Sequence, residues 1–239
     1  MEGTAIVARV FRGFGRIGER GPADGPPLMV IPGFLATDRT TLGLQRALAR
    51  AGYRVTGWGL GQNRGVRADT LRSILARIEA FGRGRPVILL GWSLGGIYAR
   101  EAAKLRPDLV AKVVTLGAPF SGDRRNNNVW RLYELIARHP VDSPPIGGDP
   151  SVKPPVPTLA LWSRRDGIVA VCAARGEPGE ADRDQEIDCS HMGFAVSARA
   201  YPQVVEAVRG FDLPRDGEGD QAEPGGGGSA NRTAPSATA

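Results

Sequence analysis

The sequence has few of the residues from which metal sites, disulfide frameworks and basic nucleic-acid surfaces are built. Of its 239 residues, two are cysteine and two are histidine, and neither pair has the spacing of a structural zinc site. Lysine occurs only three times, and the net charge of +6 comes from arginines scattered along the chain. A nucleic-acid-binding face would show clustered basic residues. We therefore expect neither a metal ion nor a nucleic-acid partner.

Long hydrophobic runs are also missing. The longest, such as Leu28 to Ile31 and Val87 to Leu90, are strand-sized and far below the roughly 18 residues needed to cross a bilayer, so we expect no membrane span. The first 25 residues hold no uninterrupted apolar stretch of the secretory type, which favours a cytoplasmic location. Their arginines leave weak peripheral membrane contact open, beside a solvated arm or a short strand over 5–10.

What is present is the composition of one folded domain with an irregular segment at each end. Hydrophobic residues make up 41% and charged residues 23%, which is ordinary for a chain that buries a core. From Pro214 onward large apolar residues disappear, and a run from Gly225 to Ser229 resembles a flexible linker. We predict an N-terminal arm over 1–25, a folded domain over 26–212 and a disordered Gly/Ser-rich tail over 213–239.

Within the domain, strand-like apolar runs alternate with segments of helical periodicity. This order is typical of an α/β fold with a mostly parallel central sheet and helices on both faces. About six core strands are expected, over 28–31, 53–56, 86–90, 110–116, 158–162 and 185–187. Helices are expected over 40–50, from a cap at Asp69 to Gly82, and over 94–105, 129–138 and 201–210.

The segment Gly91-Trp92-Ser93-Leu94-Gly95 has the pattern G-x-S-x-G between a predicted strand and a predicted helix. A sharp strand-to-helix turn would lift the serine hydroxyl out of the sheet, and small residues on each side would let backbone pass close by. The helix N-terminus would add positive potential. The simpler alternative is a glycine-flanked turn in which Ser93 only caps the helix.

The stretch Gly91 to Gly96, GWSLGG, resembles the nucleophile elbow of the α/β-hydrolase superfamily, especially its small lipase and esterase branch. The resemblance covers about residues 26–212. It implies that Ser93 is the nucleophile and that an acid and a histidine follow in that order, each in a loop after a later strand.

His191 and Asp166 occupy the places that the resemblance implies. His191 follows the strand predicted over 185–187, whereas His139 ends a helix before a proline and can bond terminal carbonyls. Asp166 follows the strand over 158–162 and would hold the imidazole in its useful tautomer. The alternatives for the acid are Asp182, Asp184 and Asp188.

Acyl transfer also needs hydrogen-bond donors for a developing oxyanion. The resemblance implies the N–H of Leu94, after the nucleophile, and the N–H of Phe34, in the loop after the first core strand. Leu35 is the alternative to Phe34, and Pro32 stands where many lipases have histidine. Phe34, Trp92, Phe120 and Trp130 either line an apolar groove or belong to the core.

Together these residues predict a serine carboxylesterase or lipase-like hydrolase that needs no cofactor and acts on a small-molecule ester or lipid-like substrate. An acyltransferase or thioesterase would use the same groups, and a non-catalytic acyl-binding protein would keep only the scaffold. The segment 119–156 provides a minimal cap. Cys172 lies shortly after Asp166, and Cys189 lies two residues before His191. They are interpreted as reduced thiols, with a disulfide between them as the alternative.

Overall fold

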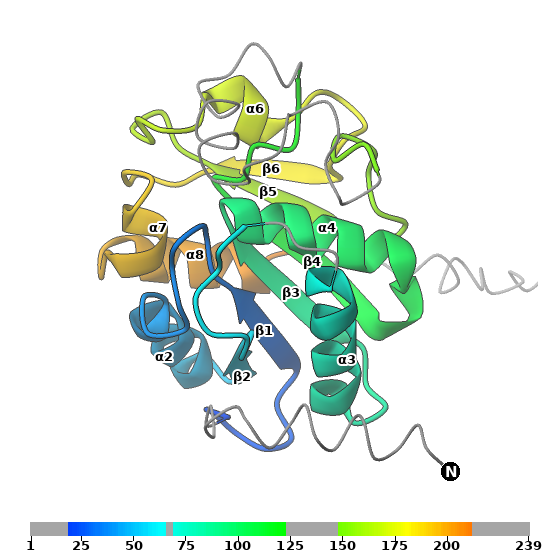
Figure 1. The fold of residues 1–239 in the computed structure, drawn as a ribbon. Helices are drawn as coiled ribbons and strands as arrows, with labels where there is room; N and C mark the ends of the chain where they lie inside the picture. Colours follow the sequence, from blue (N-terminus) through cyan, green and yellow to red (C-terminus); the bar gives the residue numbers. More distant parts are fainter. Residues whose placement is uncertain (1–18, 66–68, 123–147, 212–239) are drawn as a thin grey trace, which may run out of the picture.

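The computed structural model describes residues 19–65, 69–122 and 148–211 (Figure 1). The strand considered over 5–10, the helix expected over 129–138 and the tail over 213–239 lie outside these residues. His139 and Trp130 lie outside them as well.

The described strands form one sheet in the order β2-β1-β3-β4-β5-β6, and every neighbouring pair is parallel. Most of them are apolar and buried along their length, because helices cover both faces of a parallel sheet. This confirms the predicted fold class. The strands are β1 (Pro27–Ile31), β2 (Arg54–Gly57), β3 (Val87–Trp92), β4 (Val110–Leu116), β5 (Thr158–Trp162) and β6 (Arg183–Glu186).

The helices divide between the two faces of the sheet (Figure 1). Apolar side chains of α2, α7 and α8 pack on one face, and those of α3 and α4 pack on the other. The short helix α6 packs beside β5. The bounds are α2 (Leu42–Arg50), α3 (Thr70–Gly82), α4 (Leu94–Leu105), the 3₁₀ turn η1 (Pro107–Leu109), α6 (Val171–Arg175), α7 (Gly193–Val196) and α8 (Ala200–Arg209).

The predicted helices and strands within the described residues agree with these elements to within about two residues at most ends. The cap predicted at Asp69 is wrong in its chemistry. Asp69 does occupy the position before α3, but its side chain forms no capping hydrogen bond. Its carboxylate instead accepts a hydrogen bond from Arg72, one turn along the helix, at 3.2 Å.

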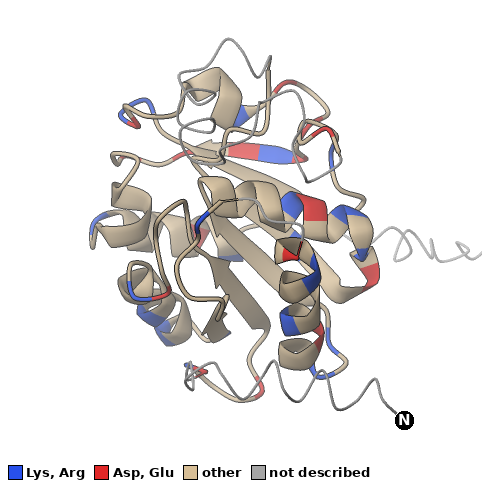
Figure 2. Cartoon of the chain, in the orientation of Figure 1, with Lys and Arg blue, Asp and Glu red and all other residues tan. Residues whose placement is uncertain are grey.

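The two edge strands differ in how they are protected. At β2, the backbone of Arg20 pairs with Val55 through two hydrogen bonds, of 2.8 and 2.7 Å, as an isolated antiparallel bridge. Beside it, Glu19 forms ion pairs with Arg54 and Arg83. β6 carries charged residues that are mostly exposed (Figure 2), a feature that discourages pairing with another chain.

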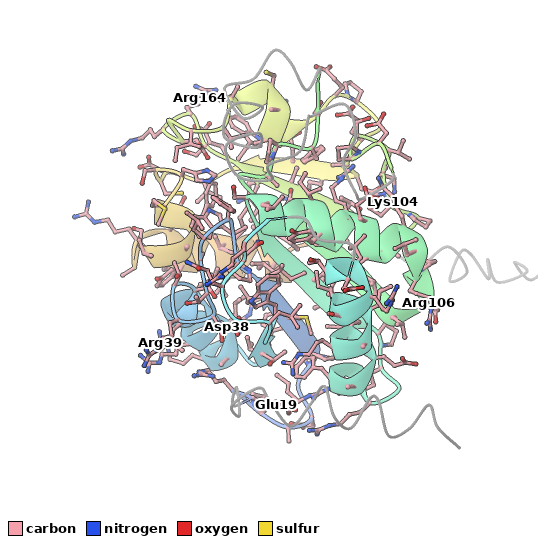
Figure 3. All side chains as sticks on the ribbon, in the orientation of Figure 1. Glu19, Asp38, Arg39, Lys104, Arg106 and Arg164 are labelled. Atoms are coloured by element: carbon pink, nitrogen blue, oxygen red, sulfur yellow. The ribbon has the colours of Figure 1, made fainter. Side chains whose placement is uncertain are left out.

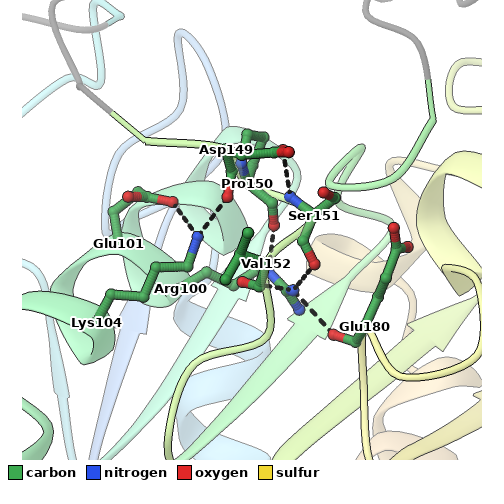
Figure 4. Close-up of polar contacts among 8 residues, drawn as sticks. All are labelled: Arg100, Glu101, Lys104, Asp149, Pro150, Ser151, Val152 and Glu180. Carbon is green, nitrogen blue, oxygen red and sulfur yellow. Dashed lines mark hydrogen bonds and ion pairs between the residues drawn. The ribbon is translucent and has the colours of Figure 1, made fainter.

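A buried arginine attaches α4 to the segment that leads into β5 (Figure 4). Arg100 is 0% exposed, and its guanidinium donates to the carbonyls of Pro150, Ser151, Val152 and Glu180 at 2.8–3.3 Å. It also stacks on the Phe120 ring, 4.1 Å from the centroid. Burial lowers the pKa of Arg100 to about 10, so the group stays charged at neutral pH.

None of the helices among the described residues is both long and apolar enough to span a membrane.

Candidate active site

Ser93 sits at a strained turn between β3 and α4. Its φ of 53° and ψ of −122° lie in a region that side-chain-bearing residues rarely adopt. A Cβ at Gly91 would lie 2.3 Å from the Gly95 carbonyl oxygen, and a Cβ at Gly95 would lie 2.2 Å from that of Ile31. Both glycines are therefore required by close backbone approach, as the sequence pattern predicts.

The Ser93 hydroxyl does not cap α4. No side-chain capping bond is formed at this position, so the alternative of a simple capping serine is not supported. The side chain is partly exposed. Because α4 begins at Leu94, directly after it, Ser93 stands at the positive end of the helix dipole.

The end of β4 brings Ser93 next to the other predicted residues. The Ser93 N–H donates to the Leu116 carbonyl at 2.9 Å, so the turn after β3 is attached to β4. The next residue, Gly117, has a φ of 53°, and a Cβ there would lie 2.8 Å from Asp166 Oδ2 and 3.3 Å from His191 Nδ1. Gly117 is therefore a site residue that the sequence analysis missed, although its place after a strand matches that of Ser93.

Asp166 and His191 form a buried pair. Nδ1 of His191 lies 2.8 Å from Oδ2 of Asp166, and their side chains are 6% and 2% exposed. The other carboxylate oxygen, Oδ1, accepts hydrogen bonds from the N–H groups of Ile168 and Val169, at 3.0 and 2.6 Å. Because Oδ1 is occupied by backbone donors, Oδ2 is free to accept a hydrogen bond from the Nδ1–H group of the imidazole.

The alternative acids have other partners. Asp182 accepts hydrogen bonds from the N–H of Thr158 and from Lys153, and Asp184 accepts from Trp162 and Arg175. Asp188 is largely exposed and pairs with Arg165. Among the described carboxylates, only Asp166 forms a hydrogen bond with His191.

The backbone around His191 is fixed by neighbouring loops. Its N–H donates to the Asp166 carbonyl at 3.0 Å, and its own carbonyl accepts from Trp92 Nε1 at 3.1 Å. The Trp92 and His191 rings lie 5.6 Å apart. In addition, Ser163 Oγ donates to the Cys189 carbonyl at 2.6 Å. The loop of His191 is thus attached to Trp92, the residue before Ser93, and to Ser163, the residue after β5.

The N–H groups of Phe34 and Leu94 are available to bind an oxyanion, whereas that of Leu35 is already bonded. The Leu35 N–H donates to the Asn63 carbonyl at 2.7 Å and is therefore occupied. Phe34 is half-buried, and its N–H is not bonded to any of the described residues. Leu94 is the first residue of α4, where an N–H has no partner within the helix.

Two of the aromatic side chains considered for an apolar groove are part of the core. Trp92 and Phe120 are 3% and 1% exposed and pack in apolar clusters. Cys172 and Cys189 are both free thiols, and Cys189 is buried. Burial, with the nearby charges of Asp166 and Asp188, raises the pKa of the Cys189 thiol to about 12.

Fold and site together define a class. The sheet is doubly wound and parallel, a serine stands at a strained turn after a central strand, and a histidine–aspartate pair lies in loops at the same edge of the sheet. That class is the α/β-hydrolase fold.

Comparison with known proteins leads to the same class. A family model described as "alpha/beta hydrolase fold" matches residues 26–143. Among solved structures, a bacterial membrane phospholipase A is 17% identical with a TM-score of 0.60, and the match covers 87% of this chain and 90% of that one. One structure described under the metagenome-derived lipolytic enzymes LipS and LipT gives 17% identity and a TM-score of 0.61, covering 81% of this chain and 95% of that one. The thioesterase domain of the curacin biosynthetic pathway gives 14% and 0.54, covering 80% and 93%.

The match to the family model places residues 26–143 in the α/β-hydrolase superfamily, and the chain has the fold of that family. At these identities the solved structures establish the fold, and the reaction has to be argued from the site.

Proposed function

We propose that this protein is a serine hydrolase that cleaves carboxylic esters through an acyl-enzyme. The observation that carries the proposal is a serine at a strained turn, with no capping hydrogen bond, beside the buried His191–Asp166 pair. In that pair Nδ1 of His191 is bonded to Asp166, which leaves Nε2 free. Among the described residues, Ser93 Oγ forms no hydrogen bond. The proposed mechanism therefore includes the formation of a hydrogen bond from Ser93 Oγ to His191 Nε2.

In the first half-reaction, Ser93 Oγ attacks the ester carbonyl carbon while His191 Nε2 takes the hydroxyl proton. The N–H groups of Phe34 and Leu94 stabilise the resulting oxyanion. When the tetrahedral intermediate collapses, the ester C–O bond breaks and His191 returns the proton to the departing alcohol. Asp166 accepts a hydrogen bond from the Nδ1–H group throughout and stabilises the imidazolium.

In the second half-reaction, water takes the place of the alcohol. His191 removes a proton from water, the oxygen attacks the acyl carbon, and the proton returns to Ser93 Oγ as the acid leaves. The same groups thus serve both steps, and neither step calls for a cofactor.

The surface beside these residues supports an apolar substrate. Three large apolar side chains, Leu35, Ile168 and Met192, are 56%, 44% and 45% exposed. Each lies one or two residues after a proposed site residue, namely Phe34, Asp166 or His191. We infer that the acyl or alcohol part of the ester is apolar, as the lipolytic neighbours also suggest.

The test is labelling by a fluorophosphonate together with hydrolysis of p-nitrophenyl esters of increasing acyl length. We expect both signals in the wild type and neither in Ser93→Ala or His191→Ala. Asp166→Asn should lose most of its activity, whereas the matched control Asp188→Asn, in an exposed ion pair of the same loops, should keep it. Absence of labelling in folded wild type would refute the proposal and favour a non-catalytic acyl-binding protein.

The acyl acceptor and leaving group define the nearest alternatives. An acyltransferase or thioesterase would form the same acyl-enzyme, and one structural neighbour is a thioesterase domain. Product analysis with added alcohols, and a comparison of thioesters with oxygen esters, separates these activities. Water as the preferred acceptor and oxygen esters as the preferred substrates are the results expected here.

A further inference from the structure

Asn63 is a polar residue buried beside the proposed site and not used in the mechanism above. It lies in the loop between β2 and α3, and its side chain is 0% exposed. Its neighbours Gln62 and Arg64 are exposed. A fully buried amide between two exposed residues points to a specific set of partners.

Those partners lie almost entirely in the loop that follows β1. The Asn63 N–H donates to the Ala36 carbonyl at 2.9 Å, and its carbonyl accepts from the Leu35 N–H at 2.7 Å. The side-chain Nδ2 donates to the Pro32 carbonyl at 2.8 Å. The remaining side-chain atom, Oδ1, accepts from the Gly65 N–H at 3.2 Å, which orients the amide.

The segment 32–36 passes directly over the nucleophile. A Cβ at Gly33 would lie 3.2 Å from the Ser93 Cβ and 3.0 Å from the Trp92 ring. Asn63 fixes this segment on both sides of Phe34, through Pro32 before it and through Leu35 and Ala36 after it. Leu35 is also held at a φ of 56°, a left-handed conformation that the bond to Asn63 helps to maintain.

We propose that Asn63 is a positioning residue that directs the Phe34 N–H toward the oxyanion. It acts through the backbone of 32–36 and does not contact the substrate. By occupying the Leu35 N–H and fixing the Pro32 carbonyl, it holds the backbone on both sides of Phe34 and so sets the direction of the Phe34 N–H. The inference rests on the proposed function, because an oxyanion arises only if Ser93 attacks an acyl carbon.

The far end of the same loop has its own attachment, so loss of the Asn63 side chain should not unfold the loop. Asp38, labelled in Figure 3, accepts hydrogen bonds from the N–H groups of Trp58 and Gly59 at 2.9 and 3.1 Å. The backbone bonds of Asn63 to Leu35 and Ala36 also do not need its side chain. A substitution therefore tests the bond to Pro32 and the precision of the loop.

The experiment compares Asn63→Asp and Asn63→Ser with wild type on a short p-nitrophenyl ester. Aspartate keeps the shape and the acceptor for Gly65 but places a carboxylate oxygen against the Pro32 carbonyl, and serine is too short to reach it. We expect kcat to fall about 10- to 100-fold with KM changed less than about twofold, since a misplaced donor weakens the transition state only.

A phenylboronic acid provides a second measurement that a merely structural role would not move. Its tetrahedral adduct with Ser93 places an oxygen where the oxyanion forms, so its affinity should fall by a factor similar to that in kcat/KM. The matched control is Gln62→Ala, which removes an exposed side-chain bond to the Leu35 carbonyl of 3.0 Å in the same loop. That variant should stay within about twofold of wild type.

The outcomes separate the two proposals. Wild type without Ser93-dependent turnover would refute the proposed function, and this inference with it. Turnover in wild type with unchanged kcat in folded Asn63 variants, or a rise in KM alone, would overturn the inference while the proposed function stands. Equal losses in Asn63→Asp and Gln62→Ala would also overturn it, because general loosening of the loop would then explain both.

Discussion

Backbone strain at Ser93 links stability to activity at a single residue. A non-glycine residue with a φ of 53° and a ψ of −122° costs on the order of 1–3 kcal/mol, which the surrounding fold must offset. Alanine keeps the Cβ and hence the strain, while glycine removes it at an entropic cost of roughly 0.5–1 kcal/mol. We therefore expect Ser93→Gly to unfold about 1 kcal/mol less easily than Ser93→Ala.

Urea unfolding of both variants measures this difference, and esterase assays should show that they are equally inactive. Gly167 also has a left-handed backbone, but a Cβ placed there would contact no neighbouring atom. A left-handed position in this chain therefore need not involve a close contact. Equal stability of the two Ser93 variants would mean that the turn is not under strain.

The two thiols should differ in reactivity, because only one of them is accessible. Cys172 is exposed, whereas Cys189 is buried with a pKa raised to about 12. Since the thiolate is the reactive species, Cys189 should stay protonated and unmodified at pH 8. A thiol reagent without reductant should modify one group per native chain and two after unfolding.

Cys172→Ser provides the control for this count, and its native form should show no reactive thiol. A single thiol or none after unfolding would contradict free cysteines and revive the disulfide. Rapid modification of both in the native state would contradict the burial of Cys189.

At the level of elements, the elbow was predictable and the loop that faces it was not. The apolar run of β3, the glycines at 91 and 95 and the helical periodicity of α4 are neighbours in the sequence, so local patterns were sufficient. The choice between Phe34 and Leu35 depends on Asn63, which lies in another loop. No local pattern reports such a pairing, although Asn63 followed by Gly65 is typical of a turn.

The attachment of α4 to the segment before β5 depends on Arg100. In Arg100→Met the side chain stays long and apolar, but four carbonyl groups lose their donor. We expect the free energy of unfolding to fall by about 3 kcal/mol, because buried carbonyl acceptors are left without a donor at a cost of roughly 1–3 kcal/mol each, offset in part by the removal of a buried charge. Urea denaturation followed by circular dichroism measures the loss.

The matched control is Arg106→Met, just after the end of α4. Arg106 is half-exposed, and among the described residues its side chain pairs only with Asp108, so its loss should leave the urea midpoint unchanged (Figure 3). If both arginine variants unfolded at the wild-type midpoint, the buried hydrogen bonds of Arg100 would not stabilise this part of the fold.

For the whole molecule, parallel topology gathers the site at one edge of the sheet. Ser93 follows β3, Gly117 follows β4, Asp166 follows β5, and His191 lies in the loop after β6. Because the strands run in the same direction, residues far apart in the sequence meet at their carboxyl ends. The sequence order of strands predicted this meeting, whereas the hydrogen bonds that fix it, such as that from Trp92 to the His191 carbonyl, required the structure.

The opposite end of the sheet determines where a stable domain begins. The sequence predicts a domain that starts at residue 26, but Glu19 pairs with Arg54, whose side chain is 3% exposed, and Arg20 extends the edge of β2. Deleting residues 1–25 would leave that guanidinium without its carboxylate. Because Glu19 is itself partly exposed, we expect a loss of about 2 kcal/mol relative to a chain that lacks only residues 1–18, rather than the larger cost of a fully buried pair.

Urea unfolding of the two truncated proteins tests this, with Glu19→Gln in the longer chain expected to reproduce part of the loss. Since the attachment lies at the end of the sheet away from Ser93, the activity of the folded fraction should be equal in all three proteins, and equal stability would place the domain boundary at residue 26 after all.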